Sequence, residues 1–149
     1  MKVGDKAPGF FLPSGDETLV SLKEFKGKKI VLYFYPKDDT SGCTKEACSF
    51  QENFSALKKK GAVLLGVSAD GVSSHARFAS KFDLSFPLLS DEKREVIKAY
   101  GVWKEKSMYG RKYMGIERTT FIIDEQGFIA HVFSKVKVDG HTKEVLDVL

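Results

Sequence analysis

The chain has 149 residues, 42% of them hydrophobic, and its 24 basic and 20 acidic side chains leave a net charge of +4 at pH 7. That length and composition suit one ordinary domain with its own core, so we expect residues 1–149 to form a single domain without structural disulfides. No apolar run approaches the ~20 residues of a membrane helix and residues 1–5 lack leader-peptide character, which favours a cytoplasmic protein that does not bind membranes.

The N-terminal segment predicts a short β-hairpin. Residues 3–12 and 17–20 flank a turn at 13–16 that contains proline and glycine, which indicates two short strands joined by a turn. Ser21 and Glu24 have the spacing of a capping box, which opens a brief helical turn. We expect this segment to be peripheral to the chemistry.

The next element is a buried strand followed by a polar loop and a helix. Residues 30–35 are β-branched or aromatic, and Pro36 ends the strand because proline has no N–H to give to a sheet. Thr40 or Ser41 then supplies the N-cap of the helix. Its apolar residues recur at helical spacing, up to a stop at Gly61: Cys43, Ala47, Phe50, Phe54 and Leu57.

Both cysteines of the chain, Cys43 and Cys48, fall on this helix. Cys43 lies in the first turn, where unpaired N–H groups and the helix dipole favour a thiolate over a thiol. Two cysteines in a cytosolic chain favour redox or catalytic use, although an inert buried thiol is an open alternative for Cys48. Their spacing does not match C-x-x-C, and the remaining metal-ligand candidates are scattered singly: His75, His131 and His141.

The middle of the chain predicts alternating strands and helices. Residues 62–67 form an unbroken apolar run, which indicates a strand parallel to the first and joined to it by a right-handed crossover. Residues 72–82 predict a helix capped by Ser73 or Ser74. Its inward positions are expected at Ala76, Ala79 and Phe82.

Two shorter elements follow this helix. Residues 86–89 predict a short strand near the sheet edge, because Pro87 cannot complete a ladder. Residues 92–100 predict a helix capped by Asp91.

Residues 104–115 have no clean period and predict a long loop. The loop holds a basic and aromatic cluster: Lys104, Lys106, Tyr109, Arg111, Lys112 and Tyr113. Nucleic-acid binding is one interpretation of such a cluster. A solvated loop or a docking surface for an acidic reductant is favoured over it, and we expect no nucleic-acid partner.

The C-terminal part predicts strands at 118–124 and 128–133, joined by a turn with glycine, and a helix at 141–149. The complete order of elements is that of an α/β, thioredoxin-like fold. We therefore expect a central mixed β-sheet flanked by helices, with the N-terminal hairpin as an extension.

The segment from Pro36 to Cys43 reads P-x-x-x-T-S-x-C, and with Cys48 it resembles the bacterioferritin comigratory protein or peroxiredoxin Q group of the peroxiredoxins. The resemblance covers essentially the whole chain. It extends to VLLGVSAD at 63–70, His75, FPLLSD at 86–91, YGV at 100–102, GIERTTFIID at 115–124 and GHTKEVL at 140–146. This resemblance implies a thiol-dependent peroxidase that acts on hydrogen peroxide and organic hydroperoxides and is re-reduced by a thioredoxin-type donor.

By the same resemblance, Cys43 is the peroxidatic cysteine and Cys48 the resolving cysteine, which closes an intramolecular disulfide with it. Thr40 is a peroxide-binding hydroxyl, Pro36 a shield, and Arg118 the guanidinium at the thiolate. The sequence departs from the group in two places. Ser41 replaces the usual proline, and residues 51–52 read Gln-Glu where many members have Arg-Asp.

The residues themselves suit this chemistry. A hydroperoxide needs a thiolate nucleophile and fixed donors for the leaving oxygen. Gly42 allows close approach of backbone N–H groups, and Arg118 can hold sulfur and peroxide together with several donors at fixed angles. Glu46, one helical turn after Cys43, can orient that guanidinium. Neither a metal nor another cofactor is indicated.

Two other functions on the same fold stay open. A thiol-disulfide exchange protein would want a C-x-x-C pair and no dedicated oxyanion donors, so Thr40 and Arg118 speak against it. A redox-regulated binding module is the second. We expect a monomer, with a weak dimer as the alternative.

The spacing of the cysteines also predicts a conformational change. In an unbroken helix, five residues advance about 7.5 Å along the axis and separate the Cα atoms by about 8.7 Å. A disulfide tolerates about 7 Å at most. We therefore expect the helix to unwind between Cys43 and Cys48 when the disulfide forms.

Overall fold

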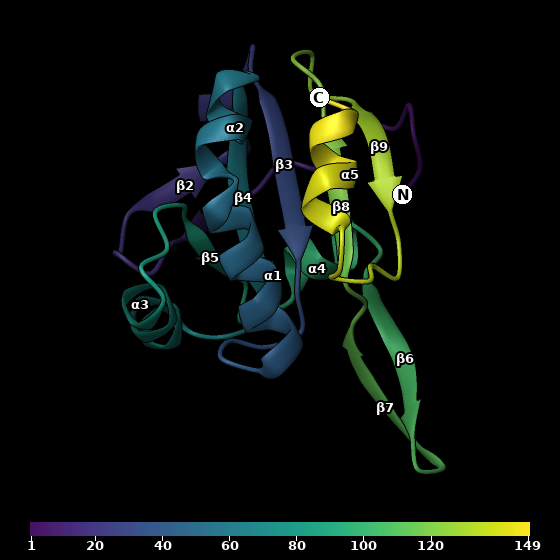
Figure 1. The fold of residues 1–149 in the computed structure, drawn as a ribbon. Helices are drawn as coiled ribbons and strands as arrows, with labels where there is room; N and C mark the ends of the chain where they lie inside the picture. Colours follow the sequence, from purple (N-terminus) through teal and green to yellow (C-terminus); the bar gives the residue numbers. More distant parts are fainter.

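In the computed structural model, which describes residues 1–149, five strands form a mixed central sheet (Figure 1). Their order across the sheet is β5-β4-β3-β8-β9. The pairs β3–β4 and β4–β5 are parallel, and β3–β8 and β8–β9 are antiparallel. The strands are β3 (Lys29–Phe34), β4 (Ala62–Ser68), β5 (Leu88–Ser90), β8 (Thr119–Ile123) and β9 (Ile129–Phe133). The predicted thioredoxin-like fold is confirmed.

The central strand β3 is buried on both faces, because its side chains alternate between two hydrophobic cores. One core holds Ile30, Leu32 and Phe34. The other core takes the residues between them and the one that follows: Val31, Tyr33 and Tyr35. The continuous apolar run that predicted this strand is explained by burial on both faces.

Helices cover both faces of the sheet (Figure 1). Four helices pack into the core that holds Tyr33: α1 (Ser41–Glu52), α2 (Phe54–Lys59), α3 (Val72–Lys81) and α5 (His141–Asp147). The short helix α4 (Glu95–Ala99) and the N-terminal segment pack into the other core. No helix has the length and hydropathy that crossing a membrane requires.

The predicted N-terminal hairpin is present and closes one edge of the sheet. It consists of β1 (Phe11–Pro13) and β2 (Leu19–Ser21), followed by the 3-10 helix η1 (Leu22–Phe25) with the expected capping box. In its turn, Ser14 makes an antiparallel bridge to Leu89 of the edge strand β5. A Cβ atom at Gly15 would lie 2.9 Å from the backbone nitrogen of Ala76, so this close approach to α3 requires glycine.

The long helix predicted from Cys43 to residue 60 is interrupted, and this part of the prediction is wrong. Asn53 ends α1 and precedes α2, and its side-chain amide donates to the Ser49 carbonyl at 2.8 Å. Such a local side-chain bond competes with the helix ladder. The expected start is correct, since Thr40 is the N-cap and Cys43 lies in the first turn.

The segment predicted as a long loop is instead a β-hairpin, formed by β6 (Trp103–Met108) and β7 (Arg111–Ile116). It extends away from the sheet (Figure 1). Most of its residues are exposed, so no buried face imposes an alternating pattern on the sequence.

Three smaller expectations about helices are also wrong. Gly71 rather than a serine is the N-cap of α3, and this helix buries His75 and Phe78 while Ala76 is exposed. The helix α4 begins at Glu95, three residues later than expected, because Asp91 lies outside the helix and accepts from the Ile97 N–H at 2.8 Å.

Candidate active site

Cys43 lies where the central strand passes into the first helix. The strand β3 ends at Phe34, and α1 begins at Ser41 and carries Cys43 as its third residue. The side chain is only 1% exposed. The first intrahelical bond runs from the Thr44 N–H to the Thr40 carbonyl at 2.8 Å. The N–H groups of residues 41–43 are therefore not used by the helix and face the start of α1.

Arg118 reaches Cys43 from the neighbouring strand. It directly precedes β8, which pairs with β3 so that Thr119 lies opposite Phe34. Its Nη2 donates to Cys43 Sγ at 3.2 Å, and its Nη1 donates to Glu46 Oε1 at 2.6 Å. The family resemblance places Arg118 at the thiolate, and the structure brings its guanidinium together with Cys43 and Glu46.

The absence of a side chain at Gly42 leaves room for the Arg118 guanidinium. A Cβ atom at this position would lie 3.2 Å from Arg118 Nη2, tighter than an ordinary contact. A larger residue would therefore push against the group that holds the sulfur.

The Glu46 carboxyl is buried and only partly paired. It is 2% exposed, and its Oε2 has no hydrogen-bond partner. Burial raises the pKa of Glu46 to about 7, and the attraction of Arg118 offsets only part of this rise. The Tyr33 hydroxyl, also buried, has no partner either, and burial raises its pKa well above the usual value. This incompletely paired group of Glu46, Arg118 and Tyr33 is called the Glu46 cluster below.

Thr40 and Pro36 flank the site without bonding to the sulfur. The Thr40 hydroxyl donates to the Lys37 carbonyl at 2.9 Å rather than capping the helix. Pro36 is half-buried and lines a cleft beside the loop. Both residues lie on the segment between β3 and α1, as expected.

Cys48 lies five residues after Cys43 on the same unbroken part of α1. Both cysteines are free thiols. Cys48 is half-buried, and its pKa is raised by burial and then by the negative charge of Glu52. Arg118 thus contacts one sulfur only.

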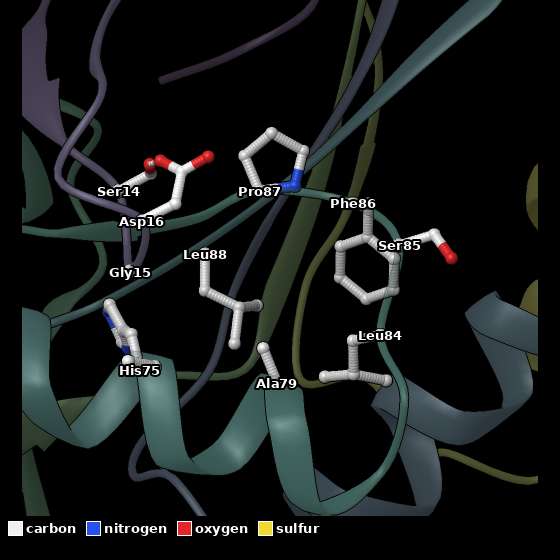
Figure 2. Close-up of a pocket in the computed structure, with 11 residues that line it drawn as sticks. Ser14, Gly15, Asp16, His75, Ala79, Leu84, Ser85, Phe86, Pro87 and Leu88 are labelled. Atoms are coloured by element: carbon white, nitrogen blue, oxygen red, sulfur yellow. Dashed lines mark hydrogen bonds between the residues drawn. The ribbon is translucent and has the colours of Figure 1, made fainter.

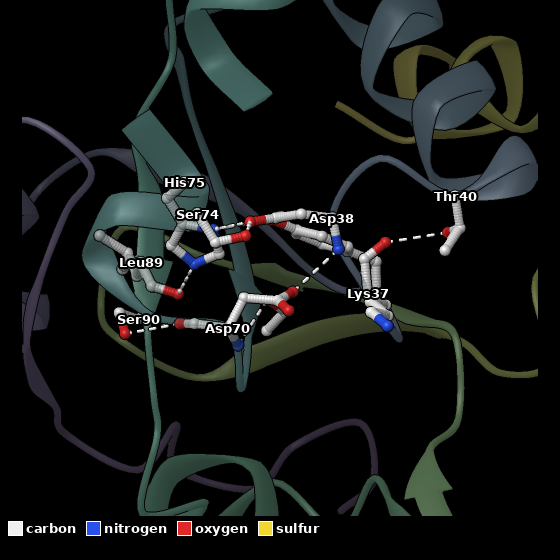
Figure 3. Close-up of polar contacts among 10 residues, drawn as sticks. Lys37, Asp38, Thr40, Asp70, Ser74, His75, Leu89 and Ser90 are labelled. Atoms are coloured by element: carbon white, nitrogen blue, oxygen red, sulfur yellow. Dashed lines mark hydrogen bonds and ion pairs between the residues drawn. The ribbon is translucent and has the colours of Figure 1, made fainter. Parts of the chain in front are cut away.

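Asp38 anchors the loop before α1 to the neighbouring helix α3 (Figure 3). His75 Nδ1 lies 2.7 Å from Asp38 Oδ2, and the Ser74 hydroxyl donates to the same oxygen at 2.7 Å. The Tyr35 hydroxyl donates to the other carboxylate oxygen at 2.6 Å. The backbone N–H of Asp38 is held by Asp70 Oδ2 at 2.8 Å. These residues, which we call the Asp38 network, pair every polar atom of the carboxylate.

The contacts of His75 fix where its hydrogens lie. Its Nε2 lies 3.0 Å from the Leu89 carbonyl, which can only accept, so this nitrogen carries a hydrogen. A second hydrogen between Nδ1 and Asp38 Oδ2 joins the two buried side chains. Burial raises the pKa of Asp38, but the bonds from His75 and Tyr35 outweigh it and leave the pKa lowered.

The sequence interpretation missed this network, although one signal was present. Asp38 and Asp70 follow the carboxyl ends of the parallel neighbours β3 and β4, which places both at one edge of the sheet. Together with His75 they offer ligand atoms within 4.8 Å of one another, as a metal site would require. The protein's own donors and acceptors already satisfy these atoms.

Gln51 occupies a position where the sequence departs from the group it resembles. Its amide accepts from the Ser85 N–H at 2.7 Å and donates to the Ser85 hydroxyl at 3.1 Å. The position therefore fixes α1 to the segment before β5.

A separate cavity of about 310 Å³ lies under the N-terminal hairpin (Figure 2). Gly15, His75, Leu84, Phe86 and Leu88 are among its lining residues. Neither Cys43 nor Arg118 lines it, so it is not the reacting centre.

The fold and a buried thiol held by a guanidinium define a thiol-based enzyme of the thioredoxin-like class. A family model described as the AhpC/TSA family matches residues 3–132. A Bcp peroxiredoxin of Coxiella burnetii is 55% identical over 146 residues, which are 98% of this chain and 97% of the relative. The chain therefore belongs to the AhpC/TSA family, in its Bcp or peroxiredoxin Q group of thiol peroxidases.

Solved structures agree with this assignment. A cysteine-to-serine variant of peroxiredoxin Q from Xylella fastidiosa has a TM-score of 0.94 and 38% identity, covering 99% of this chain and 94% of its own. The bacterioferritin comigratory protein of Xanthomonas campestris, described by its alkyl peroxide reduction activity, has a TM-score of 0.88 and 41% identity. That match covers 93% of this chain and 88% of the other.

Proposed function

We propose that Cys43 reduces hydrogen peroxide and organic hydroperoxides, and that Cys48 resolves the oxidised sulfur for a thioredoxin-type reductant. The observation that carries this proposal is the 3.2 Å bond from Arg118 Nη2 to Cys43 Sγ. A fixed positive donor stabilises a thiolate and the oxygen it attacks. The alkyl peroxide reduction ascribed to the Xanthomonas campestris relative supports the substrate class.

In the first step, the Cys43 thiolate attacks one peroxide oxygen and the O–O bond breaks. The sulfur becomes a sulfenic acid, and the second oxygen leaves as water or an alcohol after taking a proton. Arg118 and the free N–H groups of residues 41–43 are the donors available for the developing charge. The Thr40 hydroxyl joins them by leaving the Lys37 carbonyl.

In the second step, the Cys48 sulfur attacks the sulfenic acid, a disulfide forms and water leaves. A partner dithiol then exchanges with the disulfide, which restores both thiols and leaves the partner oxidised. We place this cycle in a monomer and in the cytoplasm, a reducing compartment in which a dithiol donor can restore the two thiols.

Stopped-flow measurement of peroxide consumption by the reduced protein tests the function. We expect a fast phase of one peroxide per Cys43, which Cys43→Ser abolishes and Cys48→Ser keeps for a single turnover. A protein that exchanges disulfides but consumes no peroxide would instead be the thiol-disulfide exchanger. A protein that does neither would be the redox-regulated binding module.

Formation of the Cys43–Cys48 disulfide is expected to unwind α1. Both cysteines lie within Ser41–Glu52, where helical geometry separates their Cα atoms by about 8.7 Å, more than the ~7 Å of a disulfide. We expect hydrogen exchange at residues 43–50 to be faster in the oxidised protein than in the reduced one. Cys48→Ser is the control, because it can be oxidised but cannot close the ring. Equal protection in both states, with the Cys43–Cys48 disulfide verified by mass spectrometry, would contradict the unwinding.

A further inference from the structure

The β6–β7 hairpin extends past the end of the central sheet at which α1 begins (Figure 1). Its second strand leads through Glu117 to Arg118, the residue that holds Cys43. Four of its large apolar or aromatic side chains are strongly exposed: Met108, Tyr109, Tyr113 and Met114. Tyr109 at the tip is 98% exposed.

A cleft of about 350 Å³ separates this hairpin from the loop after β3. Its apolar lining comes from Pro36 on the active-site loop and from Trp103, Met114 and Ile116 on the hairpin. The cleft therefore lies between the hairpin and the loop that carries Asp38. A partner seated here would lie next to the segment that carries Cys43.

Most of the charged side chains that line this cleft are cationic. Lys37, Arg94 and Lys106 line it, and Arg94 stacks on the Trp103 ring at 5.0 Å. Asp70 is the only carboxylate in the lining, and the Asp38 N–H and a serine hydroxyl already hold it.

The hairpin itself carries four cations, namely Lys104, Lys106, Arg111 and Lys112, against the single acid Glu105. Glu105 faces Lys112 at 3.7 Å. Burial and then the neighbouring charge of Arg118 lower the pKa of Lys106, and an anion placed in the cleft would favour the charged form of this lysine. The surface thus has an apolar centre and a cationic rim.

We propose that the cleft and the exposed face of the hairpin, together the hairpin cleft, dock the protein that reduces the Cys43–Cys48 disulfide. The inference rests on the proposed function. It assigns to the partner an apolar surface around its dithiol and an acidic rim, which complement the apolar centre and the cationic rim of the hairpin cleft. A second copy of this chain fits poorly, because its own cationic hairpin would face this one.

The position suits the exchange chemistry. Unwinding at the start of α1 brings the disulfide to the edge beside the hairpin. One partner thiolate then attacks a sulfur of the disulfide, forming a mixed disulfide and freeing one protein thiol. The partner's second thiol then attacks the mixed disulfide, which restores the other thiol of this protein. The partner leaves with its two cysteines joined in a disulfide.

Charge reversal at the hairpin tip tests the docking surface. The variant Arg111→Glu/Lys112→Glu changes two exposed residues that make no contact with either cysteine, and Lys59→Glu/Lys143→Glu is the charge-matched control on α2 and α5. Three rates are measured for each protein: peroxide reduction in a single turnover, recycling by dithiothreitol, and recycling by a purified thioredoxin kept reduced by its reductase.

We expect the hairpin variant to lose about tenfold in kcat/KM for thioredoxin, with a flatter dependence on salt, because the loss falls on electrostatic association. Its peroxide and dithiothreitol rates stay at the wild-type level, and the control variant keeps all three rates.

The outcomes separate the two proposals. A wild-type thioredoxin rate in the hairpin variant overturns the docking surface and leaves the peroxidase function intact. A wild-type protein that consumes no peroxide overturns the proposed function instead. Self-association of the wild-type protein that the hairpin variant loses, with an unchanged thioredoxin rate, assigns the surface to a second copy and also overturns the docking proposal.

Discussion

Two buried polar groups of side chains lie on either side of the loop that leads to Cys43, and they differ in how completely they are paired. The Asp38 network satisfies both carboxylate oxygens and both imidazole nitrogens of its central pair. The Glu46 cluster leaves Glu46 Oε2 and the Tyr33 hydroxyl without partners. A buried polar atom without a partner costs about 1–3 kcal/mol. The Glu46 cluster therefore carries a cost in stability that the Asp38 network avoids.

This difference in pairing corresponds to two roles, because one group supports the loop and the other takes part in the chemistry. The satisfied network holds one end of the loop in place, which fixes where α1 begins. The incompletely paired cluster contacts the reacting sulfur through Arg118, and its groups can rearrange without breaking a closed set of bonds. Incomplete pairing near a reactive group is expected where function rather than stability sets the arrangement.

The largest expected effect comes from breaking the satisfied network. His75→Leu leaves the Asp38 carboxylate buried without its imidazole partner, which should cost about 3–5 kcal/mol in the free energy of unfolding. Urea denaturation measures this loss of stability. Adding Asp38→Asn in the same chain should recover part of the loss, because it removes the unpaired charge and keeps an acceptor for Tyr35. An unchanged urea midpoint in His75→Leu would show that the pair is not a stabilising anchor.

The next effect concerns the chemistry of the Glu46 cluster. Arg118→Lys keeps the positive charge but loses the fork that reaches Cys43 Sγ and Glu46 Oε1 together, so we expect peroxide reduction to fall by about 10²–10³-fold. Stopped-flow kinetics measures the rate, and circular dichroism verifies that the fold is kept. Wild-type rates in a folded variant would remove Arg118 from the reacting centre.

The smallest effect is a dependence of stability on pH. The folded pKa of Glu46 is about 7, above the ordinary value of 4.5, so the folded protein keeps a proton that the unfolded chain releases. Stability from this group is fully present below about pH 4.5 and is lost as pH rises through 7, a change on the order of 2–3 kcal/mol.

Glu46→Gln keeps the neutral form at every pH. Its free energy of unfolding should therefore vary less between pH 4.5 and 8 than that of the wild-type protein, when both are measured in urea. Parallel pH profiles of the two proteins would contradict the raised pKa.

The sequence predicted the parts of the fold whose side chains are constrained by burial. The strands β3 and β4 are buried on both faces and read as unbroken apolar runs. The meeting of Arg118 with Cys43 and Glu46 was predictable only in part. The one-turn spacing of Cys43 and Glu46 on α1 is a local pattern, whereas the pairing of β3 with β8 is not, and the family resemblance placed Arg118 at the thiolate.

Other features leave no such pattern. The β6–β7 hairpin has few buried side chains, so its sequence shows no alternation. His75 lies 37 residues from Asp38, and a polar pair at that distance has no periodic signal. The break at Asn53 depends on one side-chain bond to Ser49, which the apolar spacing on both sides conceals.

The break at Asn53 also has a consequence for the timing of catalysis. It ends α1 after twelve residues, so the segment that unwinds in the proposed cycle is short, while α2 stays packed through Leu57. The unwinding of α1 also breaks the core packing of Ala47 and Phe50, so it is a local unfolding step, which takes about microseconds to seconds. Enzyme turnover typically takes about 1 ms to 1 s. The conformational step is therefore expected to contribute to the rate of the cycle.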